Sequence, residues 1–144
     1  MGAVSNLLDS KGHDVLTVSP DITVHDALEQ MEEISAGTAV VTDGDKLVGI
    51  VAERDVIRKV VLGDKKLSKV TVNEIMSTDL TTVTPETSLD DCMELITEKR
   101  IRHLPVMIGD RICGIVSIGD IVKYLVFEKD FKIKNLETYI SGVM

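Results

Sequence analysis

The stretch that decides the fold is GIVSIGD at residues 114–120, where an apolar strand pattern runs directly into a polar turn that begins a helix. The chain contains a similar pattern earlier, as GIVAERD at residues 49–55. Both copies carry an aspartate, Asp55 or Asp120, three positions after the residue at the turn. Because self-similarity at a fixed spacing marks a repeated structural unit, we expect a fold built from two copies of one unit.

The similarity extends outward from these two stretches over most of the chain. An offset of 65 residues aligns Val15–Val61 with Leu80–Val126 without a gap. Upstream, Val4–Leu8 aligns with Val72–Met76 at an offset of 68, so the first copy holds three extra residues within the polar turn Asp9–Gly12. A tandem repeat is therefore predicted.

Each copy predicts the element order β-α-β-β-α. In the second copy, Pro85 stops a short strand, a Ser or Thr cap precedes an acidic first helical turn, and Gly109-Asp110 is typical of a tight hairpin. The predicted elements lie, in order, at Thr82–Val83, Leu89–Ile96, Leu104–Ile108, Ile112–Val116 and from Ser117 onward.

The predicted fold class is α+β, with two pseudo-symmetric βαββα repeats packed as one module and a C-terminal helix. We assign residues 1–62 to the first repeat, 63–71 to a linker, 72–127 to the second repeat and 128–144 to the C-terminal helical extension. Half of a 144-residue chain is marginal alone, so we expect the two halves to share a core. The apolar stripe of the extension can pack on this chain or on a partner chain.

The composition argues against several classes of protein. The net charge is −8, with no Trp, two Phe and two Tyr, so binding to nucleic acid is not expected. The apolar runs are too short to span a membrane. Cys92 and Cys113 have no further Cys or His at ligand spacing, so we predict no metal site. Two free thiols fit a cytoplasmic location.

No catalytic set is visible, and we predict that the chain is not an enzyme. Its three histidines, His13, His25 and His103, do not pair with Cys or Ser in a nucleophile signature. The chain also has no P-loop and no GxGxxG motif. A binding function is therefore favoured over catalysis.

The turn at Ser117 is a candidate site for an anion. A strand that runs into a helix presents free backbone N–H groups and a positive dipole. The Ser117 hydroxyl can donate to a phosphate oxygen, and the Asp120 carboxylate can accept both hydroxyls of a ribose. The same Ser-x-x-Asp spacing also fits a capping box, in which Ser117 only starts the helix. The residues of this turn leave both interpretations open.

A second feature is the sequence IRHLP at residues 101–105, at the entrance of a predicted strand. We expect this end of the strand to lie on the same edge of the repeat as the Ser117 turn. Arg102 can bind phosphate through two hydrogen bonds, and His103 can donate another. We therefore expect this cationic entrance and the turn with Asp120 to surround one sugar phosphate.

The combination of LTTVTP (80–85), IRHLPV (101–106) and GIVSIGD (114–120) resembles the CBS domain, named for cystathionine β-synthase. The resemblance covers Val4 to Leu125 as a tandem pair, and it is greatest to small bacterial proteins made only of such a pair. It implies a regulatory module that binds an adenine nucleotide, has no catalytic activity of its own and forms a homodimer.

The resemblance also implies roles for individual residues of the second repeat. Asp120 would hold the ribose and Thr82 would contact the adenosine. Ser117, Arg102 and His103 would hold the phosphate. The residues that would flank the base or lie beside it complete this set: Val83, Ile101, Leu104, Pro105 and Val116.

The first repeat departs from this pattern at its phosphate-binding positions. Ala52 stands in place of Ser117, while Gly37 and Thr38 stand in place of the Arg-His pair. We expect this pocket to disfavour phosphate or to be empty, so the better-equipped pocket is placed in the second repeat. Arg54 can reach across to serve that second pocket or form a surface salt bridge. The first-repeat residues in the predicted ligand-binding set are Thr17, Thr38, Arg54 and Asp55.

AMP is the first choice of ligand, because the second pocket has groups for a short phosphate tail. ADP, ATP and NAD are alternatives, because a cleft between two repeats can accept a longer ligand. A different class of function is a ligand-free dimerisation or adaptor protein, in which the Ser117 turn only caps its helix. The sequence identifies no downstream protein target.

Overall fold

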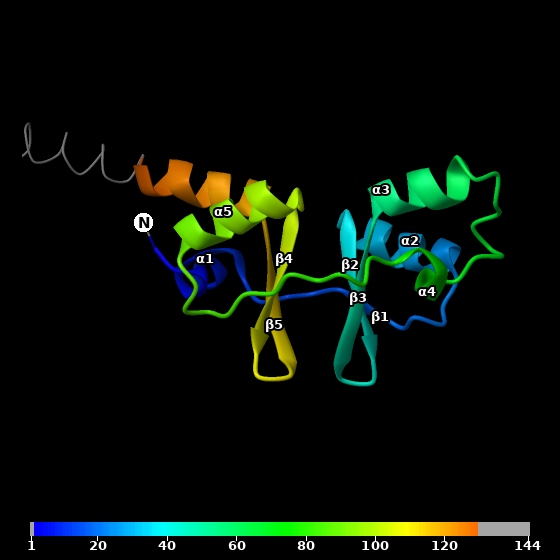
Figure 1. The fold of residues 1–144 in the computed structure, drawn as a ribbon, viewed down its shortest axis with the longest axis horizontal. Helices are drawn as coiled ribbons and strands as arrows, with labels where there is room; N and C mark the ends of the chain where they lie inside the picture. The colour runs from blue at the N-terminus through cyan, green and yellow to red at the C-terminus, as the bar shows by residue number, and fades with distance from the viewer. Residues whose placement is uncertain (1, 130–144) are drawn as a thin grey trace, which may run out of the picture.

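The computed structural model describes residues 2–129, which form two similar halves standing side by side (Figure 1). The first repeat contains β1 (Thr17–Val18), α2 (Val24–Glu33), β2 (Thr38–Asp43), β3 (Lys46–Ala52), α3 (Glu53–Val56) and the π-helical turn η1 (Ile57–Val61). The second contains α5 (Leu89–Lys99), β4 (His103–Ile108), β5 (Arg111–Ser117) and a helix over residues 118–129. A lead-in helix precedes each repeat, α1 (Val4–Lys11) and α4 (Val72–Ile75).

The strand pairing confirms the predicted β-α-β-β-α order and the mixed α+β class. In the first repeat β1 runs parallel to β2, with Val18 opposite Val41, and β2 pairs antiparallel with β3. In the second repeat β4 and β5 form the equivalent hairpin, and Val83 forms a single parallel bridge to Val106 in place of β1. The rest of the predicted C-terminal helix, residues 130–144, lies outside the described part of the chain.

Turns and caps follow the residues that the sequence provides at those positions. Gly44 and Gly109 take φ values of 63° and 60° at the hairpin turns, a backbone conformation that suits glycine. The Ser88 hydroxyl accepts a hydrogen bond of 3.0 Å from the backbone N–H of Asp91 and so caps α5. The hydroxyl of Thr23 caps α2 in the same way.

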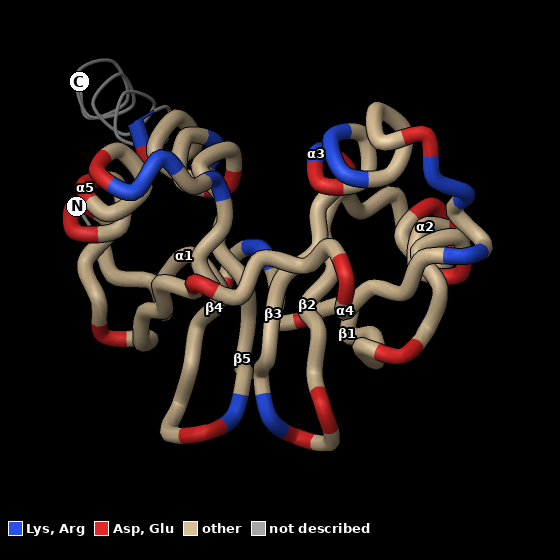
Figure 2. The backbone as a smooth tube through the Cα atoms, turned by 45° about the vertical axis from the view of Figure 1, so that its right-hand side comes forward, with Lys and Arg blue, Asp and Glu red and all other residues tan. Residues whose placement is uncertain are grey.

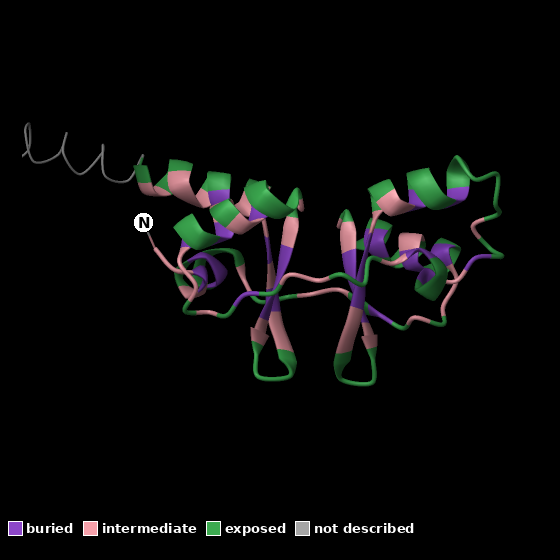
Figure 3. Ribbon diagram, viewed as in Figure 1, coloured by how far each residue is buried: buried purple, intermediate pink, exposed green. Residues whose placement is uncertain are grey.

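The two halves have separate cores, so the expectation of one shared core is wrong. The buried residues of each half gather where its hairpin meets its helices (Figure 3). The N-terminal helix α1 packs in the core of the second repeat through Val4, Leu7 and Leu8. In exchange, α4 packs in the core of the first repeat through Val72 and Ile75. The lead-in helices are thus exchanged between the halves, and the packed units differ from the linear repeats.

Backbone hydrogen bonds fasten both exchanged helices in the same manner. At the start of α4, Val24 donates to the carbonyl of Val70, and Val72 donates to the carbonyl of Ile22. The equivalent hydrogen bonds are present at the start of α1, where Leu89 donates to the carbonyl of Gly2 and Val4 donates to the carbonyl of Thr87. The exchange therefore satisfies backbone groups as well as burying apolar side chains.

An acidic and a basic residue are adjacent at each of the two neighbouring hairpin turns, where Asp45 precedes Lys46 and Asp110 precedes Arg111 (Figure 2). These turns therefore carry charge of both signs. Over residues 2–129, the helices lack the length and apolar character needed to cross a bilayer.

Candidate functional site

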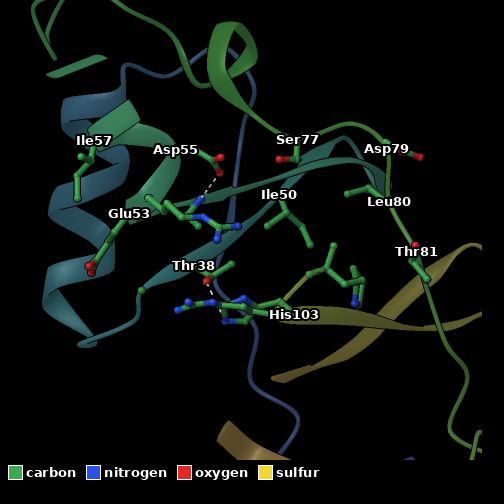
Figure 4. A pocket seen from close by; sticks show the side chains of 16 residues that line it. Thr38, Ile50, Glu53, Asp55, Ile57, Ser77, Asp79, Leu80, Thr81 and His103 are labelled. Carbon is green, nitrogen blue, oxygen red and sulfur yellow. Dashed lines mark hydrogen bonds between the residues drawn. The ribbon is translucent and has the colours of Figure 1, made fainter. Parts of the chain in front are cut away.

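Two cavities lie between the halves, and each is lined by both repeats. The first, of about 420 Å³, contains Asp55 and is called the Asp55 cavity (Figure 4). Its lining includes Gly37, Thr38, Ala52, Arg54 and Asp55 from the first repeat, and Ser77, Asp79, Ile101, Arg102, His103 and Pro105 from the second repeat and its lead-in.

The second cavity, of about 540 Å³, contains Asp120 and is called the Asp120 cavity. The two repeats exchange roles in this cavity. The helix start that lines it comes from the second repeat, and the lead-in comes from the first. The residues that line it include Lys11, Asp14, Leu16, Ser35, Gly37, Thr38, His103, Ile115, Ser117 and Asp120.

The two cavities meet at one pair of side chains. The Thr38 hydroxyl and Nε2 of His103 lie 3.1 Å apart and are hydrogen-bonded, and both residues line both cavities. They occupy the same position in the two repeats, 65 residues apart. The pair therefore lies where the pseudo-symmetric repeats face each other, as Figure 4 shows for the side facing Asp55.

Charges converge on this pair from both sides. Burial lowers the pKa of His103, and nearby Lys11, Arg102 and Arg54 lower it further, while Asp120 acts in the opposite direction. A neutral imidazole that is already hydrogen-bonded and surrounded by cations can take up a proton when an anion arrives.

The structure corrects the predicted grouping of Arg102 with Asp120. Arg102 lines the Asp55 cavity, whereas Ser117 and Asp120 line the Asp120 cavity. The backbone N–H of Ile118 donates to the Arg102 carbonyl over 3.0 Å, so the main chain of the strand entrance does lie beside the turn. The Arg102 side chain, however, belongs to the cavity that holds the helix start of the other repeat. Because the repeats face each other, the strand entrance of each repeat lines the cavity that contains the aspartate of the other repeat.

The Asp55 cavity has more cationic groups than the first repeat alone provides, although Glu53 adds a negative charge to its lining. The Asp55 cavity receives Arg102 and His103 from the second repeat, in addition to Arg54 from α3. Arg54, for which a role in the second pocket and a surface salt bridge were both left open, lines the Asp55 cavity. Thr38 and Asp55 lie in this cavity as well, and so does the acid Asp79. The cavity therefore combines carboxylates, one of them at a helix start, with cationic and hydrogen-bonding groups.

The other predicted ligand-binding residues divide among the cavity wall, the core and other parts of the surface. Ile101 and Pro105 line the Asp55 cavity. Val83, Leu104 and Val116 are at most 4% exposed and belong to the core of the second repeat. The two threonines lie elsewhere on the surface, since Thr17 is exposed on β1 and Thr82 lines a groove beside the hairpin turns. Alternation along a strand explains the buried set, because every second side chain points into the core.

The capping box proposed for the Ser117 turn is present. The backbone N–H of Ser117 donates to Oδ2 of Asp120 over 2.9 Å, and the backbone N–H of Asp120 donates to the Ser117 hydroxyl over 3.0 Å. In the first repeat only half of this arrangement forms, from the Ala52 N–H to Oδ2 of Asp55 over 2.9 Å, because alanine has no hydroxyl. Both acids therefore hold the start of a helix and face a cavity at the same time.

Lys11 is a site residue that the sequence analysis missed. Its ammonium forms an ion pair with Oδ2 of Asp120 and donates to the carbonyl of Ile115 over 2.7 Å. Burial alone raises the pKa of Asp120, but the hydrogen bonds from Lys11 and Ser117 outweigh burial and hold the pKa below its usual value. The available signal was the three-residue insertion at Asp9–Gly12, which contains this lysine.

One cluster of potential metal ligands occurs among residues 2–129, formed by His25, Asp26 and Glu29. All three are exposed on one face of α2, and Nδ1 of His25 lies 3.0 Å from Oε1 of Glu29. This arrangement is an ordinary contact between side chains one turn apart on a helix surface. The prediction that the protein binds no metal stays a prediction.

Comparisons with known proteins agree with this architecture. The family model described as "CBS domain" matches residues 6–62 and 72–127. The mitochondrial CBS domain-containing protein CBSX3 of Arabidopsis thaliana is 36% identical over 148 residues, covering 96% of this chain and 72% of that protein. The CBS domain-containing protein YhcV of Bacillus subtilis is 30% identical over 118 residues, covering 82% of this chain and 84% of that protein.

Solved structures show the same similarity in three dimensions. The crystal structure of the CBS domain NE2398 superposes with a TM-score of 0.82 at 41% identity, covering 86% of this chain and 97% of that chain. The CBS-domain protein ATU1752 of Agrobacterium tumefaciens gives 0.80 at 37% identity, covering 85% and 98%. With its two matched repeats, its exchanged lead-in helices and its paired cavities, the chain belongs to the CBS-domain family, as a tandem pair.

Proposed function

We propose that this protein is a regulatory module that binds an adenine nucleotide between its repeats, with AMP as the preferred ligand and no catalysis of its own. The observation that carries this proposal is the shared centre of the two cavities, the hydrogen-bonded Thr38–His103 pair. Arg54 and Arg102 accompany it in the Asp55 cavity and Lys11 in the Asp120 cavity, within a chain of net charge −8. These cations stand among the acids of the same linings, Glu53, Asp55 and Asp79 in the Asp55 cavity and Asp14 and Asp120 in the Asp120 cavity. A few cations of this kind can bind one small phosphate, whereas a polyanion would need an extended basic surface.

The arrangement of polar groups fits a ribose phosphate in each cavity. A carboxylate at the helix start can accept ribose hydroxyls, and the phosphate would then extend toward the shared centre. We place the first nucleotide in the Asp55 cavity, because Asp55 accepts one hydrogen bond, from Ala52, and forms no ion pair among the described residues. A volume of about 420 Å³ lies within the range of small-molecule sites.

A short phosphate tail explains the choice of AMP. Both cavities converge on the same Thr38–His103 pair, so a long tail from one cavity would enter the space of the other. ADP, ATP and NAD are the alternatives, since one of these could extend through the shared centre into the opposite cavity.

Isothermal titration calorimetry with AMP, ADP, ATP, NAD and adenosine tests this proposal. We expect AMP to bind most tightly and adenosine to bind weakly, because adenosine lacks the phosphate. Arg102→Ala should weaken AMP binding by about 10- to 100-fold, the loss typical of a charge-assisted hydrogen bond. Arg111→Ala is the matched control, because Arg111 is exposed at a hairpin turn and lines neither cavity. Failure of all five ligands to bind would reject the proposal.

A ligand-free adaptor that only pairs chains is the second candidate, favoured by exposed apolar side chains. Ile57, Val61 and Leu62 are 54–73% exposed along one helical segment, and Val122 and Phe127 are 51–65% exposed on the helix over residues 118–129. Exposed apolar patches of this kind commonly mark protein interfaces. We propose a homodimer formed through these helices, although the related CBS-CP12 protein of bloom-forming cyanobacteria is described as hexameric. Light scattering with and without AMP separates a constitutive dimer from one that responds to nucleotide.

The free cysteines fit the proposed cytoplasmic location. Cys92 is buried and Cys113 is partly buried, and neither forms a disulfide. Burial raises the pKa of Cys92 to about 11, so its thiol stays protonated and unreactive at neutral pH. The Arabidopsis relative is named as mitochondrial, another reducing compartment.

A further inference from the structure

The two lead-in helices differ in length, although they occupy equivalent places in the two halves. The helix α1 has eight residues and α4 has four. The difference coincides with the three extra residues within Asp9–Gly12 of the first copy. Because α1 continues for another turn, it ends on Lys11, beside the helix start of the second repeat.

In the Asp120 cavity, Lys11 forms an ion pair with the carboxylate of Asp120. Its ammonium contacts Oδ2 of Asp120 and the carbonyl of Ile115, and the two charged side chains are only 29% and 27% exposed. A partly enclosed ion pair of this kind is less screened by water than a surface pair. The carboxylate is thereby satisfied from within the protein.

The Asp55 cavity has no equivalent of this contact. Its lead-in contributes Ser77 and Asp79 but no lysine, and within residues 2–129 the Asp55 side chain forms no ion pair. The cations of this cavity, Arg54 and Arg102, do not pair with Asp55. Asp55 and Asp120 thus occupy equivalent positions in the two repeats, but only Asp120 is engaged by an ion pair among the described residues.

We propose that Lys11 closes the Asp120 cavity to the ribose of a nucleotide, so that the wild-type protein binds a single nucleotide, in the Asp55 cavity. This inference rests on the proposed function and assigns Lys11 as a residue that determines site occupancy. A ribose that approached Asp120 would have to replace a charge-assisted hydrogen bond with neutral ones. The displaced ammonium would keep only its contact with the carbonyl of Ile115.

Binding stoichiometry for AMP tests the inference directly. We expect one AMP per wild-type chain and two per chain in Lys11→Met, with the second site at least 10-fold tighter than any second site of the wild type. Lys11→Arg keeps the charge and should keep the stoichiometry at one. Lys99→Met is the control for loss of a positive charge, since Lys99 is exposed at the end of α5 and lines neither cavity. Lys11→Gln provides a second neutral variant if Lys11→Met folds poorly.

The outcomes separate this inference from the proposed function. One AMP in both wild type and the neutral variants would overturn the inference and leave nucleotide binding intact. Two AMP in the wild type would do the same. Absence of AMP binding in the wild type and in every variant would overturn both.

Discussion

The first and second halves of this molecule share one fold but differ in the lead-in helix that completes each core. The second core is completed by the longer helix α1, which adds Leu7 and Leu8, and the first by the shorter α4, which adds Ile75. The longer helix also brings Lys11 onto Asp120, while Asp55 remains without an ion pair among the described residues. A duplicated cavity can therefore become asymmetric through the segment before the repeat, with the strand framework unchanged.

The largest effect on stability is expected when an apolar side chain is truncated in each exchanged helix. Leu7→Ala and Ile75→Ala should each lower the free energy of unfolding by about 2–4 kcal/mol, because both residues are at most 2% exposed. Native-state hydrogen exchange distinguishes their locations. Leu7→Ala should reduce protection in α5 and β4, far along the chain, and Ile75→Ala should reduce it in α2 and β2. Loss of protection in the reverse pattern would contradict the exchange of helices.

A second test examines the close approach of α1 to β5. A Cβ atom at Gly114 would lie 2.9 Å from Cδ2 of Leu8, closer than such atoms pack. Gly114→Ala should therefore lower the free energy of unfolding by about 1–2 kcal/mol. A double-mutant cycle measured by urea unfolding checks the cause, since Leu8→Ala should remove most of the additional penalty. Additive effects would show that the two residues do not meet.

A third test compares the two acids by their effect on stability against pH. The pKa of Asp120 is held below its usual value of 3.8, so its ionised form stabilises the fold above that pH. This contribution is lost as the pH falls through the lowered pKa. At pH 7, Asp120→Asn should cost about 1 kcal/mol, by loss of the cap and of the pairing with Lys11, and the difference should narrow below about pH 4. Asp55→Asn should cost less across the whole range, because Asp55 has no ion pair among the described residues.

The smallest expected effect is a change in the protonation of His103, in the Thr38–His103 pair, when AMP binds. Burial and the neighbouring cations lower the pKa of His103 in the free protein, so the ring is neutral at pH 7. A phosphate bound beside it would raise that pKa, so binding of AMP should be accompanied by proton uptake at His103. Calorimetry in buffers of different ionisation enthalpy measures this uptake. His103→Gln should lower the uptake by the contribution of this ring, and an unchanged uptake in that variant would place the titrating group elsewhere.

The composition of each cavity could not be predicted from the repeat alone. Arg102 and Asp120 lie 18 positions apart in one repeat, and their grouping around one phosphate was a natural expectation. The repeats face each other, however, so the Arg102 side chain lies with Asp55 and His103 lies in both cavities. Side-chain direction across an interface depends on how two units pack, and no local pattern within one unit contains that information.

The sequence by itself determined the duplicated β-α-β-β-α order, the hairpin turn at Gly109 and the cap at Ser88, because these depend on short-range periodicity and on backbone preferences of single residues. Only the tertiary structure decided the exchange of the lead-in helices and the pairing of Lys11 with Asp120. The latter two side chains are 109 positions apart, and they meet because apolar burial places α1 against the second repeat rather than its own.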